Sequence, residues 1–496
     1  MQNTKNPDKF ALTIRDASSY LDTEYPLVVD LDGTLISTDL LHEALILLLR
    51  KNPLYLISCV IWILRGKAYL KNKIFTLIHI PAELLPYNAE ILELLKREAE
   101  SGRKLVLATA SPLSNALAIA TIHPIFYKIY GTENNVNLKS DKKLSLLIRE
   151  FGKSRFDYIG NSYSDLKIFA SARYSYLVNP SLLVRIKARK KSHVKQIWNF
   201  KKNPFKSYFK AIRMYQWVKN LLIFVPLITS HSFFSIRSLT LAMLAFVSFS
   251  FVASAGYLIN DLLDLNADRI HPRKRLRPLA SGRISILNGF AFSIMLLVAG
   301  FILASSLNYK FWMIVLFYFF TSLSYSIFLK RIVLYDVFVL AVLYSTRVFA
   351  GGVATNISLS SWLIAFSTFI FLSLAFVKRY SELLKVGDDN ILEKRGRGYF
   401  VEDIPLLQTM GVVSGFLSVI VFSLYLDSPD VSLLYSNPRV LWITSLLFLF
   451  WVSRIWMLTV RGKMTDDPII YTLKDWVSYL IFVLVALCIL FAMYTS

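Results

Sequence analysis

The stretch that decides the fold reads LTLAMLAFVSFSFVASAGYLI over residues 239–259 and continues as NDLLDLNADRIHPRKRLR over residues 260–277. The first part is apolar and has the roughly 20 residues that an α-helix needs to cross a bilayer. The second part places three carboxylates within eight residues and follows them at once with a cluster of Arg and Lys. This arrangement indicates either a solvated loop of a membrane protein or a place where an anion is held.

Apolar runs of this kind recur through the second half of the chain. From residue 213 on, nine runs each approach the length of about 20 residues that a bilayer requires. They are centred near residues 224, 249, 296, 319, 341, 368, 416, 447 and 485. We therefore predict an all-α polytopic membrane bundle of nine transmembrane helices over residues 213–496.

The loops between these runs predict the orientation, because Lys and Arg gather on the cytoplasmic side of a membrane protein. One alternate set of loops is rich in these residues and the other set carries few. With the N-terminal half inside, the cytoplasmic loops are 261–286, 330–331, 378–403 and 459–475, and the outer loops are 231–237, 306–310, 351–360 and 426–438. We expect an inner-membrane protein with a cytoplasmic N-terminal domain and its C-terminus outside.

The formal net charge of +23 has a related explanation. A single basic patch would suggest nucleic-acid binding, but many of these cations lie in short loops between apolar runs. Anionic lipid head groups and phosphorylated substrates are therefore the expected electrostatic partners, and no nucleic acid is expected.

Residues 1–195 follow a different pattern. The short β-rich runs LVVDLDG, KLVLATA, FDYIGN and YSYLVN alternate with helical stretches, which predicts a parallel α/β sheet. The basic run RIKARKKSHVKQIWNFKKNP (185–204) suits an anionic membrane surface, and residues 196–212 are expected to link the two halves.

The insertion over residues 39–100 lies between the first two predicted strands and has the helical character of a cap. Within it, LYLISCVIWIL (54–64) is too short to span a bilayer. Two interpretations stay open for this run: a buried helix, or a membrane-facing surface of the cap.

The sequence VVDLDGTL (28–35) places Asp30 and Asp32 at the end of a hydrophobic strand. It resembles the haloacid dehalogenase (HAD) phosphatase family, whose signature is DxDGT after a buried strand. The resemblance implies a HAD-like Rossmannoid domain in which Asp30 attacks phosphorus to form an aspartyl-phosphate. Asp32 would protonate the leaving alcohol and then activate water.

Further HAD motifs follow in order along the chain. Thr109 in LATAS would hold the phosphoryl oxygens, with Ser111 as a second choice. Lys143 in SDKKLSLL would neutralise the phosphoryl charge, with the rivals Lys139 and Lys142.

The segment GNSYSD (160–165) ends the next strand and would supply metal ligands. The resemblance implies Mg²⁺ bound by Asp30, the backbone carbonyl of Asp32, Asn161 and Asp165. Asn161 stands where the family usually has Asp, and an amide oxygen coordinates Mg²⁺ without adding charge. A weaker metal affinity is therefore expected.

The acidic stretch after residue 259 supports a second metal site. On a helix, Asp261, Asp264 and Asp268 would all point the same way, and Asn260 would pair with Asp264. Clustered carboxylates repel one another unless cations join them, which favours Mg²⁺ that bridges to a diphosphate. Three cations that follow, Lys274, Arg275 and Arg277, are placed to reach the remaining phosphate oxygens.

NDLLDLNAD (260–268) resembles the first aspartate-rich motif, NDxxDxxxD, of the UbiA prenyltransferase superfamily, whose members bind diphosphate through Mg²⁺. Most members carry a second aspartate-rich motif, whereas the matching segment here reads AFVKRYSELLK. It puts Lys378, Arg379 and Glu382 on one expected helical face, which suits a phosphate monoester better than a second metal.

Four further segments resemble the decaprenyl-phosphate phosphoribosyltransferase branch of this superfamily. They are RMYQWVKNLLIF (213–224), HPRKRLRPLASG (271–282), KRYSELL (378–384) and RGKMTDDP (461–468). The resemblance places Lys219 and Asn220 near the active cavity. Tyr257, one turn before the aspartates, faces the same way.

These features together predict a bifunctional membrane enzyme. The membrane half would transfer a phosphoribosyl group from phosphoribosyl diphosphate to a polyprenyl phosphate, and the HAD domain would remove the 5-phosphate. Two alternatives remain: an aromatic prenyltransferase that uses a polyprenyl diphosphate, and a non-enzymatic membrane partner.

Overall fold

The computed structural model describes residues 24–133, 138–200, 204–384, 398–429, 431, 435–464 and 467–494. The chain divides into two compact units. Unit 1 comprises Met1–Ala211 and Asp261–Phe290, and unit 2 comprises Ile212–Asn260 and Ala291–Ser496. The aspartate segment after residue 260 therefore belongs to the same compact unit as the N-terminal domain.

Unit 1 is built on a six-stranded, fully parallel sheet with the order β3-β2-β1-β4-β5-β6. The predicted parallel sheet is confirmed, and the four predicted strands correspond to β1, β2, β4 and β5; β3 and β6 were not predicted. The strands are β1 (Leu27–Val29), β2 (Leu105–Pro112), β3 (Lys128–Thr132), β4 (Asp157–Gly160), β5 (Ser175–Val178) and β6 (Val194–Trp198).

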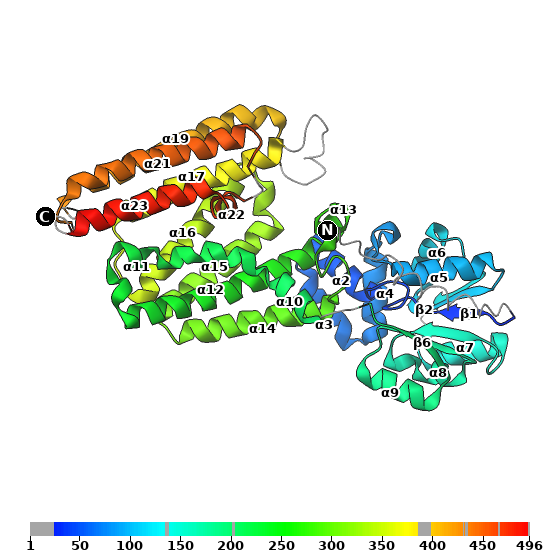
Figure 1. The fold of residues 1–496 in the computed structure, drawn as a ribbon. Coiled ribbons are helices and arrows are strands. Elements are labelled where there is room, and N and C mark those ends of the chain that lie inside the picture. Colours follow the sequence, from blue (N-terminus) through cyan, green and yellow to red (C-terminus); the bar gives the residue numbers. More distant parts are fainter. Residues whose placement is uncertain are drawn as a thin grey trace, which may run out of the picture. The chain divides into compact units, whose positions relative to one another are not determined.

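Helices cover both faces of this sheet, as Figure 1 shows, with α5 and α6 on one side and α7, α8 and α9 on the other. Alternation along β1 explains the two layers: Leu27 and Val29 join one hydrophobic core, and Val28 joins the other. The helices are α5 (Ala89–Glu100), α6 (Leu113–Ile122), α7 (Asp141–Phe151), α8 (Leu166–Ser171) and α9 (Leu182–Lys191).

Most of the described part of residues 196–212, the range expected to link the two halves, is regular secondary structure. Val194–Trp198 form β6, which pairs with β5 at the edge of the sheet, and Pro204–Ile212 form helix α10. The alternation in VKQIW explains the strand, because Ile197 and Trp198 pack on the cores on opposite faces of the sheet. Residues 201–203 lie outside the described part of the chain.

Between β1 and β2 the chain forms the helices α2 (Leu40–Lys51), α3 (Tyr55–Leu64) and α4 (Lys67–Leu77). The prediction of a helical insertion is confirmed. The interpretation of residues 54–64 as a buried helix was wrong, because α3 has no buried residue. Only Tyr55, Cys59 and Trp62 pack, partly buried, against the core.

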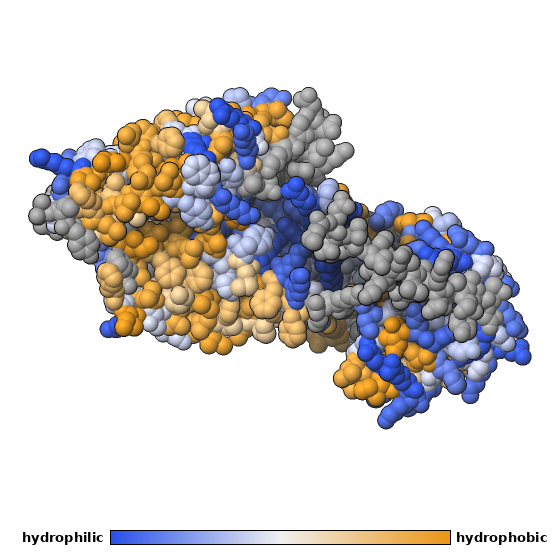
Figure 2. Space-filling view, in the orientation of Figure 1, coloured by the Kyte–Doolittle hydropathy of each residue, from blue (hydrophilic) through white to orange (hydrophobic). Residues whose placement is uncertain are grey.

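The described residues contain eight helices long and apolar enough to cross a membrane. They match eight of the nine predicted runs. Figure 2 shows that apolar side chains cover most of the visible surface over these helices. The helices are α12 (Ile236–Leu263), α14 (Ile286–Ser305), α15 (Tyr309–Ile327), α16 (Tyr335–Thr355), α17 (Ser361–Leu384), α19 (Ile404–Leu426), α21 (Trp442–Val460) and α23 (Trp476–Tyr494).

The ninth run, centred near residue 224, is not one long α-helix. It divides into the 3₁₀-helix η5 (Met214–Phe224) and the short helix α11 (Val225–Thr229), with Pro226 at the α-helical start. A 3₁₀-helix rises about 2 Å per residue, against about 1.5 Å in an α-helix, so the two pieces in line would extend about 30 Å. Nine crossings therefore stay a prediction.

Close helix packing in unit 2 depends on small residues. A Cβ atom at Gly411 would collide with the Trp456 ring, and one at Gly351 would collide with the backbone of Ile223 in η5. Small residues allow helices to approach closely where no hydrophobic effect drives them together. The contact of α19 with α21 and that of α16 with η5 depend on these two glycines.

Candidate functional site

Asp30 follows β1 at the carboxyl end of the sheet, where parallel sheets usually bind their ligands. Lys143, from α7, donates to Asp30 Oδ1 at 2.7 Å, and the exposed fractions of the two side chains are 4% and 11%. The structure therefore brings Lys143 to the predicted nucleophile. It leaves the rival Lys142 exposed and Lys139 outside α7.

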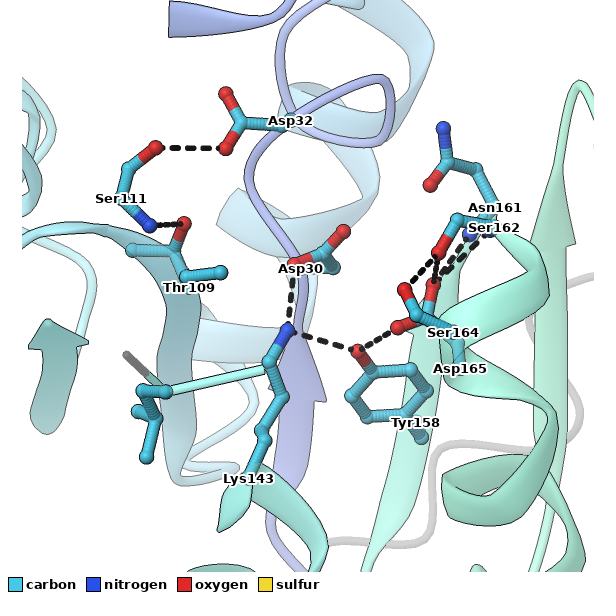
Figure 3. Close-up of polar contacts among 12 residues, drawn as sticks. Asp30, Asp32, Thr109, Ser111, Lys143, Tyr158, Asn161, Ser162, Ser164 and Asp165 are labelled. Carbon is cyan, nitrogen blue, oxygen red and sulfur yellow. Dashed lines mark hydrogen bonds and ion pairs between the residues drawn. The ribbon is translucent and has the colours of Figure 1, made fainter. Parts of the chain in front are cut away.

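Asp32 lies on the side of Asp30 that faces β2 (Figure 3). The Ser111 hydroxyl donates to Asp32 Oδ2 at 2.8 Å, and the backbone N–H of Leu40 donates to Oδ1 at 2.9 Å. Thr109 is fully buried and accepts the N–H of Ser111 at 3.0 Å. Both predicted hydroxyls therefore lie near Asp32, and the one that contacts its carboxylate is the second choice, Ser111.

Asn161 and Asp165 lie on the opposite side of Asp30 in Figure 3. Asp165 Oδ1 accepts the Tyr158 hydroxyl at 3.1 Å, and Oδ2 accepts Ser162 N–H at 3.0 Å and the Ser162 hydroxyl at 2.8 Å. Both oxygens of Asp165 are therefore engaged by protein donors. Tyr158, which also accepts from Lys143 at 3.3 Å, was missed because a Tyr inside a strand carries no motif signal.

Gly33 leaves room for the side chain of Asn161. It adopts a φ of +74°, and a Cβ atom there would collide with the Asn161 amide. Asn161 Oδ1 is buried and has no hydrogen-bond partner. An unpartnered carbonyl oxygen beside a buried carboxylate is a donor set that suits Mg²⁺, so the residues present fit the predicted ion.

The charges of the pocket shift its carboxyl groups. Burial, opposed by Lys143 and reinforced by Asp165, raises the pKa of Asp30 to about 7. Burial and the neighbouring Asp39 raise the pKa of Asp32 to about 6, although the hydrogen bonds from Leu40 and Ser111 lower it. The pocket holds more carboxylates than cations.

The aspartate segment lies partly outside α12, which ends at Leu263. Asp264 is the N-cap of a second helix, α13 (Leu265–Ile270), so the expectation of one continuous helix was wrong. Asp261 and Asp268 still come together: Arg277 Nη1 donates to Asp261 Oδ1 at 3.0 Å and to Asp268 Oδ2 at 2.6 Å. Two carboxylates are brought together here, and among the described residues no group of three or more acidic, His or Cys side chains is placed to hold a metal ion.

The other residues of this segment divide by exposure. Lys274 and Arg275 are exposed in the short helix η7 (Lys274–Leu276), whereas Asp261 and Asp268 are buried. Asn260 and Tyr257 lie on α12, and Tyr257 is one helical turn before Asp261.

A buried ion pair in unit 1 was not predicted. Arg269 donates to both carboxylate oxygens of Glu43 on α2, at 3.0 and 2.6 Å, and its Nε donates to the carbonyl of Ala280 at 3.0 Å. The exposed fractions of the two side chains are 7% and 2%. This bidentate pair fastens the aspartate segment to α2, the helix whose first residue, Leu40, donates to Asp32.

In unit 2, Lys219 forms a buried ion pair with Asp467, which lies just before helix α22 (Pro468–Thr472). Burial raises the pKa of Asp467, but Lys219 and Lys378 outweigh it and hold that pKa below its usual value. The charge of Asp467, in the RGKMTDDP segment, also acts on Tyr257. Lys219, Lys378 and Tyr257 therefore all interact electrostatically with Asp467, and of these the Lys219–Asp467 ion pair is a direct contact. Thr465 and Asp466 of that segment lie outside the described residues.

Arg379 has a different environment from Lys378, although the two are adjacent. It is 1% exposed and forms ion pairs with Asp336 on α16 and with Glu382 one turn later. Tyr399 donates to Asp336 Oδ1 at 2.5 Å. The expectation that Lys378 and Arg379 share one helical face was wrong, because residues one apart on a helix point about 100° apart. Arg379 is held by carboxylates inside the bundle.

Asn220 takes part in a second buried network. Its Oδ1 accepts Arg347 Nε at 2.9 Å, its Nδ2 donates to Ser250 at 2.9 Å, and Arg347 also donates to the Tyr318 hydroxyl at 3.0 Å. Arg347 was missed because it lies in the middle of an apolar run. Charged groups at such positions are rare and usually paired.

The model of the UbiA prenyltransferase family matches residues 221–495. This chain belongs to that family. The match contains all eight apolar helices, so the chain is a multi-pass membrane protein. Unit 1 up to residue 211 lies outside the UbiA match.

Three proteins are similar in sequence to this UbiA-family chain. An uncharacterized protein, y4nM, of Sinorhizobium fredii is 35% identical over 95% of this chain and 92% of its own length. Nodulation protein NoeC of Azorhizobium caulinodans is 33% identical over 60% of this chain and 98% of its own length. Decaprenyl-phosphate phosphoribosyltransferase of Mycobacterium tuberculosis is 36% identical over 35% of this chain and 59% of its own length.

Proposed function

We propose that this chain transfers a phosphoribosyl group from phosphoribosyl diphosphate to a polyprenyl phosphate, and that its N-terminal half is a HAD phosphatase that removes the 5-phosphate. The Lys219–Asp467–Lys378 cluster carries the first step of this proposal. Two lysines around one carboxylate leave a net positive charge, which suits a phosphate monoester better than a second metal ion. The similarity to decaprenyl-phosphate phosphoribosyltransferases supports the same substrate class.

In the transferase step, an oxygen of the polyprenyl phosphate attacks C1 of the ribose, and the C1–diphosphate bond breaks. The attacking phosphate is already anionic at neutral pH, so no general base is needed. Lys378 and Lys219 would hold its charge. Asp261, Asp264 and Asp268 would hold Mg²⁺, which when bound neutralises the charge of the departing diphosphate.

Four other polar groups have supporting roles in this proposal. Arg277, Lys274 and Arg275 would bind the diphosphate oxygens as it leaves. Asn260, which precedes the first aspartate, would orient the same group. Arg379 has no such role, because it is 1% exposed inside the bundle against Asp336 and Glu382, whereas the Arg277 side chain is 25% exposed.

In the phosphatase step, Asp30 attacks the 5-phosphate and Asp32 protonates the departing ribose oxygen. Asp32 then takes a proton from the water that cleaves the aspartyl-phosphate. Lys143 stabilises the phosphoryl charge, and Thr109 and Ser111 orient its oxygens and Asp32. Asp30, Asn161, Asp165 and the Asp32 carbonyl would hold Mg²⁺, which when bound offsets the negative charge of the pocket.

The test uses the full chain in detergent with Mg²⁺, a polyprenyl phosphate and phosphoribosyl diphosphate labelled on the ribose. We expect wild type to form a labelled lipid without the 5-phosphate, Asp261→Ala to form none, and Asp30→Asn to accumulate the 5-phosphorylated lipid. Asp141→Asn and Glu402→Gln, at exposed carboxylates, are the matched controls. If no label enters lipid while a polyprenyl diphosphate alkylates an aromatic acid, the aromatic prenyltransferase replaces this proposal.

A further inference from the structure

Helix α3 leaves an apolar surface uncovered on unit 1. Leu64 is 83% exposed and Ile57 is 63% exposed. A contiguous apolar patch of this kind on a folded domain marks a site of interaction. The exposed set is Leu54, Leu56, Ile57, Val60, Ile61, Ile63 and Leu64.

The charges around α3 indicate what covers it. Between Glu43 and Glu83 the chain has no Asp or Glu, but it has six cations. Cations stand at both ends of the helix, with Arg50 and Lys51 before it and Arg65 after it. An apolar helix bracketed by positive charge matches a bilayer surface with anionic head groups, whereas a partner protein chain would require no such excess of one sign.

The length of α3 sets how it meets the membrane. Its 10 residues extend only about 15 Å, about half the thickness of the hydrocarbon core. Such a helix lies in the plane of the interface with its apolar side chains among the acyl chains. The family assignment makes this chain a membrane protein, so a bilayer is available for α3 to bind.

The two helices that pack against α3 also contact residues of the Asp30 pocket. α3 packs against α2 and α4. The first residue of α2, Leu40, donates to Asp32 Oδ1 at 2.9 Å. Lys71 on α4 donates to the carbonyl of Ala110, between Thr109 and Ser111. A bilayer that holds α3 therefore also holds α2 and α4, which contact Asp32 and the backbone between Thr109 and Ser111.

We propose that α3 is an interfacial anchor that inserts into an anionic bilayer surface, so that the Asp30 pocket takes phosphomonoesters carried on membrane lipids. The anchor follows from α3 alone, and the substrate class rests on the proposed phosphatase function.

The first experiment tests the anchor without any activity. The full chain, with Cys59→Ser and Cys488→Ser, carries Ile61→Cys labelled with a polarity-sensitive fluorophore, in vesicles that contain phosphatidylglycerol. We expect quenching by spin-labelled lipids and protection from aqueous iodide. The matched control is Lys96→Cys on α5, which is exposed and polar and is expected to stay open to iodide.

Two results would overturn the anchor. In the first, the fluorophore at position 61 is as open to iodide as the control. In the second, it is protected equally in detergent and shows energy transfer between labelled copies, which would mean that a second copy of the chain covers α3.

The second experiment tests the substrate class. Ile57→Ser with Ile61→Ser removes apolar area from α3 and touches no group of the pocket. We expect unchanged kcat/KM on a water-soluble phosphomonoester and a KM about tenfold higher on a vesicle-borne lipid phosphomonoester. Leu117→Ser, at an exposed apolar residue of α6, is the control and is expected to change neither.

The two experiments separate the two ideas. If wild type hydrolyses neither substrate, the phosphatase function is refuted, while the quenching result still supports the anchor. Equal KM values for wild type and the double variant on vesicles would refute the link between α3 and lipid-borne substrates.

Discussion

Two buried lysine–aspartate pairs, one in each unit, have opposite surroundings. Lys143–Asp30 shares its pocket with the further carboxylates Asp32 and Asp165. Lys219–Asp467 shares its pocket with a further lysine, Lys378. The first pair is short of positive charge and the second is short of negative charge. We therefore propose that the charge around each pair, and not the pair itself, sets the ligand class: a cation at Asp30 and a phosphate at Lys219.

The largest effect is expected at Lys143. Lys143→Met removes the cation that would stabilise phosphoryl charge, so phosphate release from a soluble phosphomonoester should fall about 10³- to 10⁵-fold. The measurement is single-turnover phosphate release. Lys142→Met, at the exposed neighbour, is the matched control and should retain wild-type activity. Equal losses in both variants would contradict the assignment of Lys143.

A third buried pair, Glu43–Arg269, sharpens the comparison because it has no proposed ligand. Arg269→Met leaves the Glu43 charge buried and alone, which should lower the free energy of unfolding of unit 1 by about 3 to 5 kcal/mol. Denaturant unfolding, monitored by the hydrogen exchange of residues 261–290, measures this free energy.

The control for this pair is the double change Glu43→Met with Arg269→Met, which should recover much of the loss because no charge stays unpaired. The exposed neighbour Arg273 provides Arg273→Met, which should have little effect. A stable Arg269→Met with normal exchange would mean that the pair does not fasten the aspartate segment.

Lys378 and Arg379 test the comparison inside unit 2. Lys378→Met should raise the KM for polyprenyl phosphate about 10- to 100-fold, because a charge-assisted contact to phosphate is lost. Arg379→Met should instead lower thermal stability, since Asp336 loses its buried partner. The reverse pattern, a KM effect at Arg379 and none at Lys378, would assign the phosphate contact to Arg379 and contradict this prediction.

The smallest effect is expected at Asn161. Asn161→Asp adds a carboxylate to the Asp30 pocket, which already holds more carboxylates than cations. The Mg²⁺ concentration for half-maximal phosphate release should therefore fall by about tenfold or less. Titration of phosphate release with Mg²⁺ measures it. Asn161→Ala removes the unpartnered oxygen and should shift the concentration the other way, and identical titrations for all three proteins would exclude Asn161 as a ligand.

Local patterns allowed much of the fold and part of the site to be predicted. The strands β1, β2, β4 and β5, the eight long apolar helices and the link between Lys143 and Asp30 all follow from runs or motifs of a few residues. Strand β6 escaped prediction because its basic, half-exposed sequence resembles a linker until β5 offers an edge to pair with. The exposure of α3 escaped for a similar reason, since an apolar run of 10 residues has the same composition whether the core covers it or a membrane does.

The sequence by itself determined which chemistry the chain carries: carboxylates after a buried strand, carboxylates after an apolar run, and cations placed for phosphate. Only the tertiary structure decided which of these groups are free to act. Arg379 and Lys378 are neighbours in the chain, but Arg379 forms an ion pair with Asp336, whereas the charge of Lys378 lowers the pKa of Asp467. A buried charge must find a partner wherever the packed helices place one, and that partner can lie more than 200 residues away, as it does between Lys219 and Asp467.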